Sequence, residues 1–129
     1  MKTVKLILTL LFGAFMIFSG INHFLKPDMY LPFIPDFLPR VLIIYLSGVV
    51  EIVLGLGVFI PRFRHLSALG ILLLMLLFLP LHIVDVFRDN PAIGSHSIAL
   101  IRLPIQFVLI LWAWFISRKQ KLSDSPVVS

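Results

Sequence analysis

The sequence predicts an all-α fold, an integral membrane bundle of four transmembrane helices in a single domain over residues 1–129. Its residues are 60% hydrophobic and only 13% charged, and its mean hydropathy is +1.08. Soluble domains have about a quarter of their residues charged. The sequence contains four apolar stretches, and the length of each is close to the roughly 20 residues that a helix needs to cross the hydrocarbon core. The helices are expected at about 4–24, 41–60, 66–87 and 98–116.

The first apolar stretch follows a basic start, MKTVK, and therefore also fits the beginning of a signal peptide. A signal peptide would then end in a cleavage site of the pattern small-x-small. The sequence Phe18-Ser19-Gly20, followed by Ile-Asn-His, does not have this pattern. We therefore interpret this stretch as a retained helix. At the other end of the chain, the polar tail 119–129 is expected to be disordered.

The basic residues predict the orientation of the bundle. With the N-terminus in the cytoplasm, seven lysines and arginines fall on the inner side and three on the outer side. This positive-inside bias places both termini in the cytoplasm. The net charge of +5 is thus mostly a topology signal, and no nucleic-acid partner is expected. The inner residues are Lys2, Lys5, Arg62, Arg64, Arg118, Lys119 and Lys121, and the outer ones are Lys26, Arg40 and Arg88.

The chain offers few ligands of its own for a cofactor. It has no cysteine, so in any redox chemistry another group or subunit carries the electrons. His23 and His82 lie on different helices, but both are close to the surface, which disfavours haem. No H-x-x-x-H or E-x-x-H spacing supports a metal site. We therefore predict no metal and no resident cofactor. These observations do not exclude a quinone as a bound ligand.

Polar residues within the apolar stretches are concentrated in the outer half of the predicted bundle. Such residues are costly in lipid and are functional candidates by default. Glu51 lies roughly 16 Å below Arg40, near the middle of a core about 30 Å thick. The inner half is almost entirely Leu, Ile, Val and Phe. The predicted polar cluster or ligand site consists of His23, Glu51, His82, Asp85, Arg102 and Gln106, and no catalytic residue is assigned.

Helical spacing suggests how the centre of this cluster is paired. Arg102 and Gln106 share a face at i, i+4, so the guanidinium is expected to reach Glu51 with Gln106 bridging. Such a network either fixes the register of the helices or belongs to a ligand or proton-handling site. Both interpretations stay open at this level.

Small residues run along the helix face that carries Glu51. Ser47, Glu51 and Gly55 fall at i, i+4 and i+8, with Gly48 alongside. This face therefore admits a close neighbouring helix and directs Glu51 inward. One face of the first helix similarly carries Gly13, Gly20 and His23.

Residues 25–39 combine four prolines with apolar side chains, among them Tyr30 and Phe33. The prolines prevent a continuous helix, and the apolar side chains disfavour bulk water. We predict that the segment lies at the outer membrane interface. It is either a lid over His23, His82, Asp85 and Arg102 or an interfacial anchor alone.

Three motifs, GINHFLKPDMYLPFIPDFLP, YLSGVVEIVLGLGVFIPRFR and IRLPIQFVLILWAWF, occur in this order. Together they resemble the DoxX-like family of small bacterial membrane proteins over residues 13–116. The resemblance implies a four-helix membrane bundle in the bacterial inner membrane, and Glu51, His23, Arg102 and Gln106 fall on recurrent polar positions of the family. Its named relatives include membrane subunits of a thiosulfate:quinone oxidoreductase and of a mycobacterial oxidoreductase complex.

These observations favour an accessory or membrane subunit of a redox-linked complex, which binds a quinone- or lipid-like ligand and is not an enzyme on its own. Its expected partners are membrane lipids, a soluble or membrane redox protein, and further copies of the same chain. One alternative is a non-catalytic scaffold in which the network of Glu51, Arg102 and Gln106 is structural. Another is a small proton-coupled carrier that uses Glu51 at the midplane.

Overall fold

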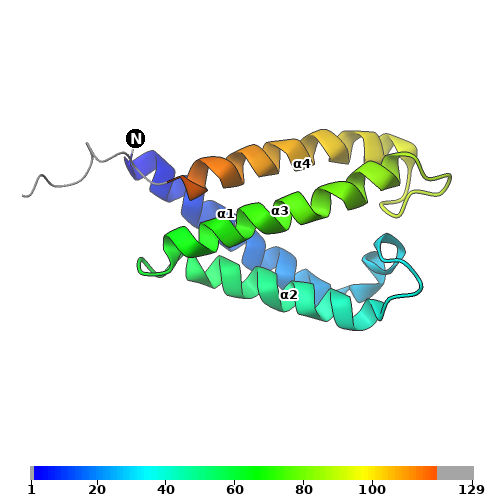
Figure 1. Cartoon of the computed structure of the whole chain (residues 1–129), viewed down its shortest axis with the longest axis horizontal. Coiled ribbons are helices and arrows are strands. Elements are labelled where there is room, and N and C mark those ends of the chain that lie inside the picture. Colours follow the sequence, from blue (N-terminus) through cyan, green and yellow to red (C-terminus); the bar gives the residue numbers. More distant parts are fainter. Residues whose placement is uncertain (1, 119–129) are drawn as a thin grey trace, which may run out of the picture.

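The computed structural model describes residues 2–118, with Lys2 described by its backbone only. All four α-helices are long and apolar enough to cross a membrane, and the described residues contain no strand, so the all-α four-helix prediction is confirmed. The predicted disorder of 119–129 concerns residues outside the described range. The helices are α1 (Lys2–Leu25), α2 (Arg40–Gly57), α3 (Arg64–Val86) and α4 (His96–Ser117), with the short 3₁₀-helices η1 (Pro27–Met29) and η2 (Leu31–Phe33) between α1 and α2 (Figure 1).

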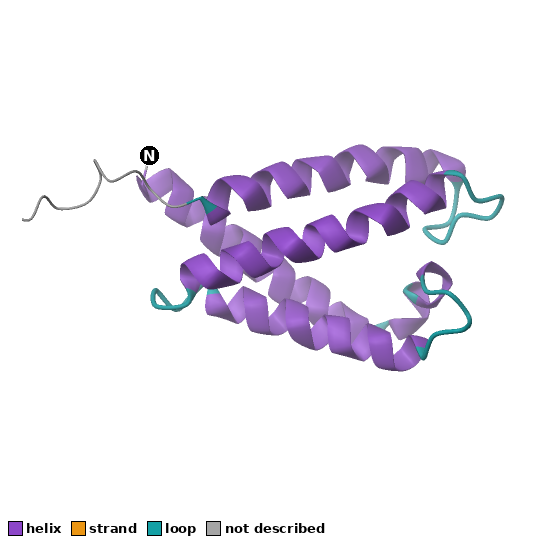
Figure 2. Ribbon diagram, viewed as in Figure 1, coloured by secondary structure: helices purple, strands orange, loops and turns teal. Residues whose placement is uncertain are grey.

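The helices form two antiparallel hairpins, because each packs chiefly against the helix that is joined to it, α1 against α2 and α3 against α4. In Figure 1, α3 lies between α4 and α2, and α1 crosses behind α3. Figure 2 shows the connecting segments 26–39 and 87–95 at one end of the molecule, which we call the loop end. The opposite end, where α1 begins and α4 finishes, is called the termini end.

Glycines bring the backbones of α1 and α2 into direct contact. A Cβ atom at Gly20 would lie 2.6 Å from the Gly48 carbonyl oxygen, and one at Gly55 would lie 2.7 Å from the Gly13 carbonyl oxygen. Real Cβ atoms do not approach backbone oxygens so closely, so only glycine allows this spacing. We call these four residues the glycine seam. The predicted small-residue face of the second helix is thus confirmed, and the neighbour that it admits is α1.

Four helix boundaries differ from the predicted ones by two or three residues, namely the starts of α1, α3 and α4 and the end of α2, and local hydrogen bonds explain two of them. α2 ends at Gly57, because the amides of Phe59 and Ile60 bond to carbonyls three residues back and turn the chain before Pro61. α4 begins at His96, two residues early, because the Ser95 hydroxyl caps the helix by accepting a hydrogen bond from the Ile98 amide at 3.2 Å. Local hydrogen bonding, which hydropathy does not report, therefore sets these ends.

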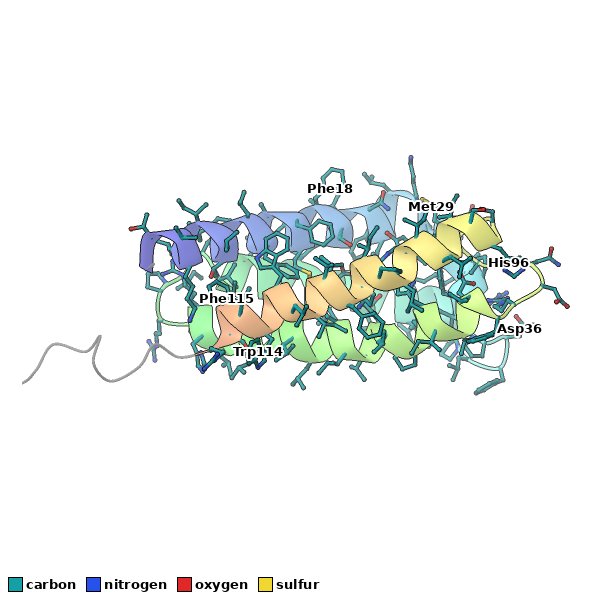
Figure 3. All side chains as sticks on the ribbon, turned by 90° about the horizontal axis from the view of Figure 1, so that it is seen from above. Phe18, Met29, Asp36, His96, Trp114 and Phe115 are labelled. Atoms are coloured by element: carbon teal, nitrogen blue, oxygen red, sulfur yellow. The ribbon has the colours of Figure 1, made fainter. Side chains whose placement is uncertain are left out.

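Apolar side chains fill the middle and the termini half of the bundle. Phe12 is fully buried and lies 4.5 Å from Trp112, ring centroid to ring centroid. Other large apolar residues cover the outside, such as Phe18, which is 75% exposed and points away from the bundle in Figure 3. The core cluster consists of Phe12, Met16, Val58, Ala68, Ile71, Met75, Leu109, Ala113 and Ile116.

Candidate functional site

A cavity of about 190 Å³ lies between the two hairpins in the loop half of the bundle. All four helices and the segment 26–39 contribute to its wall. Four of the six predicted site residues line it together, whereas Asp85 and Gln106 make their contacts elsewhere. The lining residues are Ser19, His23, Tyr30, Phe33, Ile34, Ile43, Ile44, Ser47, Glu51, Phe78, Leu81, His82 and Arg102.

His23 and Glu51 form a buried pair across the glycine seam. The distance from His23 Nε2 to Glu51 Oε2 is 2.7 Å, and the two side chains are only 6% and 2% exposed. The seam makes this distance possible, since a Cβ at Gly48 would lie 2.8 Å from the Cβ of His23. The small residues that precede these groups in each helix therefore position the pair.

The second nitrogen of His23 fixes the number of protons that the pair holds. Nδ1 lies 3.0 Å from both the Ile44 carbonyl oxygen and Ser47 Oγ, and the Ser47 hydroxyl donates to the same carbonyl at 2.9 Å. A carbonyl only accepts, so Nδ1 carries a hydrogen and donates it. Because Nε2 and Glu51 Oε2 are only 2.7 Å apart, we infer one further proton between them, since two lone pairs would otherwise face each other. The pair is therefore imidazolium with carboxylate or imidazole with carboxylic acid, and the two forms differ by the transfer of that one proton.

The expected pairing of Glu51 with Arg102 through Gln106 is not the one found. Glu51 pairs with His23, while Gln106 is fully buried and its Nε2 donates to the Met75 carbonyl oxygen at 2.7 Å. The reason is the pairing of helices into hairpins. Side chains of α4 meet α3 first, and the inward face of α2 meets α1.

Arg102 faces the cavity without an ionic partner. Its side chain is half-buried, and its Nη1 is fully buried with no hydrogen-bond acceptor among residues 2–118. Within the same residues its guanidinium forms no ion pair. His82 lines the cavity from α3 and meets the edge of Phe33, with 5.6 Å between ring centroids. The cavity thus contains a cation that the described chain does not neutralise.

Asp85 stabilises the loop that joins α3 to α4. It is 1% exposed, and its carboxylate accepts hydrogen bonds from the backbone amides of Ala92 and Ile93, the second at 3.2 Å. Arg88 Nη1 lies 3.9 Å from the same carboxylate. These contacts give Asp85 a structural role outside the cavity.

Replacing Asp85 with alanine should free the Ala92 and Ile93 amides, because their acceptor is removed. We expect their hydrogen exchange to accelerate by a factor that corresponds to about 1–3 kcal/mol of local opening. Asp85→Asn keeps one carbonyl oxygen and should give a smaller effect. Unchanged exchange in Asp85→Ala would contradict the structural role.

The segment 26–39 covers the cavity at the loop end. The Tyr30 ring lies 4.0 Å from the His23 ring, centroid to centroid, and its hydroxyl accepts a hydrogen bond from Asn22 Nδ2 at 2.8 Å. Burial raises the pKa of Tyr30 above its ordinary value of 10.0, so its own proton stays available for donation. Arg88 Nη1 donates to the Pro32 carbonyl oxygen at 2.6 Å and ties the segment to the other hairpin. These contacts support the lid interpretation.

Tyr30 and Ser47 are among the cavity residues that were not assigned to the site from the sequence, and both form hydrogen bonds there. The available signal for Tyr30 is a polar-tipped aromatic in an otherwise apolar segment, a type that needs a hydrogen-bond partner when it is buried. Ser47 stands one helical turn before Glu51 but was interpreted as a small packing residue. Among the described residues, no three His, Asp or Glu side chains lie together as metal ligands would.

Fold and cavity together define the class, a four-helix membrane protein with a cavity between two helical hairpins, in which a mainly apolar wall carries a few polar side chains. The chain belongs to the family described as a domain of unknown function (DUF8561), whose model matches residues 12–117. That range contains every residue of the cavity wall. Comparison with curated proteins and with solved structures gave no significant match.

Proposed function

We propose that the protein is an accessory or membrane subunit of a redox-linked complex and that it binds a quinone- or lipid-like molecule in the cavity. One observation carries the proposal. A mainly apolar wall carries a guanidinium, Arg102, that has no ionic partner among residues 2–118, together with the buried pair of His23 and Glu51. Sites for small molecules typically combine an apolar lining with a few convergent polar groups.

The size and the lining of the cavity favour a ligand with a planar ring. Pockets for drug-sized ligands have volumes of about 300–1,000 Å³, so a cavity of about 190 Å³ fits a head group but not a long tail. Tyr30, Phe33 and Phe78 offer aromatic surface to a planar ring. Arg102 and the His23–Glu51 pair offer hydrogen bonds to ring oxygens. A quinone combines a planar ring with carbonyl acceptors and is the ligand class that these features fit best.

The motif residues support the same proposal. Three positions of the DoxX resemblance, His23, Glu51 and Arg102, line the cavity, and relatives named within that family belong to oxidoreductase complexes. We therefore extend the proposal to a relationship with DoxX-like proteins and to the bacterial inner membrane. The basic residues of the termini end favour cytoplasmic termini, with the segment 26–39 on the outer side.

Extraction of the purified protein tests the proposal directly. Protein in mild detergent should release a quinone in near-stoichiometric amount into organic solvent, as measured by mass spectrometry. Protein that carries only bulk lipid, and that also binds no added short-chain quinone, would contradict it.

Filling the cavity tests whether the quinone binds there. Ser19→Phe places a ring against the wall without removing any of the polar groups named above, and we expect it to lose most of the bound quinone. Ala14→Phe adds the same ring to an exposed position of the same helix and should retain the quinone. Equal retention by the two variants would place the ligand elsewhere.

The alternatives predict different outcomes in the same experiments. A scaffold would carry no ligand, and Glu51→Gln would then have no consequence beyond stability. A proton-coupled carrier requires a polar route across the bundle, but apolar side chains form most of the buried core of the termini half. Among the described residues, the buried polar side chains there are the hydroxyls of Thr9, Ser67 and Ser117, and none is charged. Proteoliposomes with a Glu51-dependent proton flux would favour the carrier over the binding subunit.

A further inference from the structure

The charges that face the cavity do not sum to zero. The His23–Glu51 pair is neutral in both of its proton arrangements, and Tyr30 and His82 add no fixed charge at neutral pH. Arg102 adds one positive charge, because a guanidinium stays protonated. In the part of the chain that the structure describes, no other ionisable residue lines the cavity.

An unneutralised cation in a membrane-embedded cavity is costly. The buried Nη1 of Arg102 has no acceptor among residues 2–118, so its desolvation is not offset by a hydrogen bond. A ligand with one negative charge would supply both the acceptor and the neutralising charge. Hydrogen bonds between charged groups are shorter and roughly twice as strong as neutral ones, and the planar fork of arginine suits an oxyanion.

We propose that the cavity binds its ring-bearing ligand as a monoanion and that Arg102 selects this charge. The inference rests on the proposed function and specifies the ligand class further, as an acidic hydroxyquinone or a similar aromatic oxyanion. The head group of an anionic phospholipid such as phosphatidylglycerol has the same charge, but its hydrated hydroxyl groups match poorly with a wall that contains Phe33, Phe78 and Leu81.

Two probes of nearly equal size separate charge from shape. 2-Hydroxy-1,4-naphthoquinone is ionised at neutral pH, and 2-methyl-1,4-naphthoquinone is neutral. Each is dialysed to equilibrium against the protein in nanodiscs of neutral lipid, and its partition into empty discs is subtracted. We expect the anion to bind more tightly by about tenfold or more. The ratio should fall toward one at a pH low enough to protonate the hydroxyl of the acidic probe.

Variants identify the group responsible. Arg102→Gln should abolish the preference, whereas Arg102→Lys should keep most of it. Arg62→Gln removes an exposed positive charge outside the cavity wall and should leave the ratio unchanged. If Arg102→Gln does not fold, the ratio of the two probe affinities in the wild-type protein, and its dependence on pH, still test whether the cavity prefers a monoanion.

The outcomes separate the two proposals. Tighter binding of the neutral probe, or equal binding of both, would overturn the monoanion inference and leave the quinone site intact. Absence of binding by both probes would overturn the site itself. Anionic phospholipid in the discs that displaces the acidic probe completely would assign the charge preference to a lipid head group instead of a ring.

Discussion

Replacing Glu51 with leucine should lower the free energy of unfolding by about 3 kcal/mol, because it leaves His23 Nε2 buried without its partner. His23→Leu should cost a similar amount, since it leaves the carboxyl in an apolar wall. The double variant should recover most of either loss, because neither polar group then remains unpaired. Unfolding in mixed micelles, followed by circular dichroism, gives all three values.

Glu51→Gln is the matched control for this cycle. The amide keeps the size of the side chain and a hydrogen bond to His23, so we expect a loss well below that of the leucine variant. It removes the shared proton, however, and should therefore separate proton handling from folding. Additive effects of the two leucine substitutions would show that the contact between His23 and Glu51 contributes little to stability.

Gly20→Ala should destabilise the bundle by about 2 kcal/mol, which is the range for overpacking a tight core. The new Cβ would lie 2.6 Å from both the Gly48 carbonyl oxygen and Ile52 Cγ1, and the backbone oxygen cannot yield without separating α1 from α2. The same separation would lengthen the contact between His23 and Glu51, so the variant should also weaken ligand binding.

Gly70→Ala is the control, because it gains the same helix propensity at another helical position. Its Cβ would lie 2.6 Å from Leu54 Cδ2, the far end of a flexible side chain that can rotate away. We expect a much smaller loss than for Gly20→Ala in the same unfolding measurement. Similar losses for the two variants would show that the seam does not depend on the absence of a Cβ at Gly20.

Hydropathy and helical spacing predicted much of this arrangement, because both are local properties of the chain. Four apolar stretches of transmembrane length became four helices, and the seam positions of α2 were recognised from their i, i+4 spacing. The concentration of polar residues toward one end of the bundle predicted a shared polar cluster, and four of its six members, His23, Glu51, His82 and Arg102, line one cavity.

The pairing inside that cavity depends on which helices pack together and how each is rotated, and a single sequence carries little information on either. The predicted pairing of Arg102 with Glu51 rested only on the length of the arginine side chain. In the structure, the close packing of α1 and α2 at the glycine seam places Glu51 against His23 instead. The acceptor role of Asp85 depends on the path of an irregular loop, and the place of Tyr30 depends on two turns of 3₁₀-helix. None of these has a periodic signature in the sequence.

The position of the His23–Glu51 pair also affects how the chain enters a membrane during synthesis. Both partners lie on the first two helices, and these are consecutive in the chain. The first hairpin can therefore enter lipid with its central ionisable groups already satisfied, before the second hairpin has left the ribosome. Arg102 lies on the final helix, so the cavity's guanidinium, which has no ionic partner among residues 2–118, is inserted after the His23–Glu51 pair.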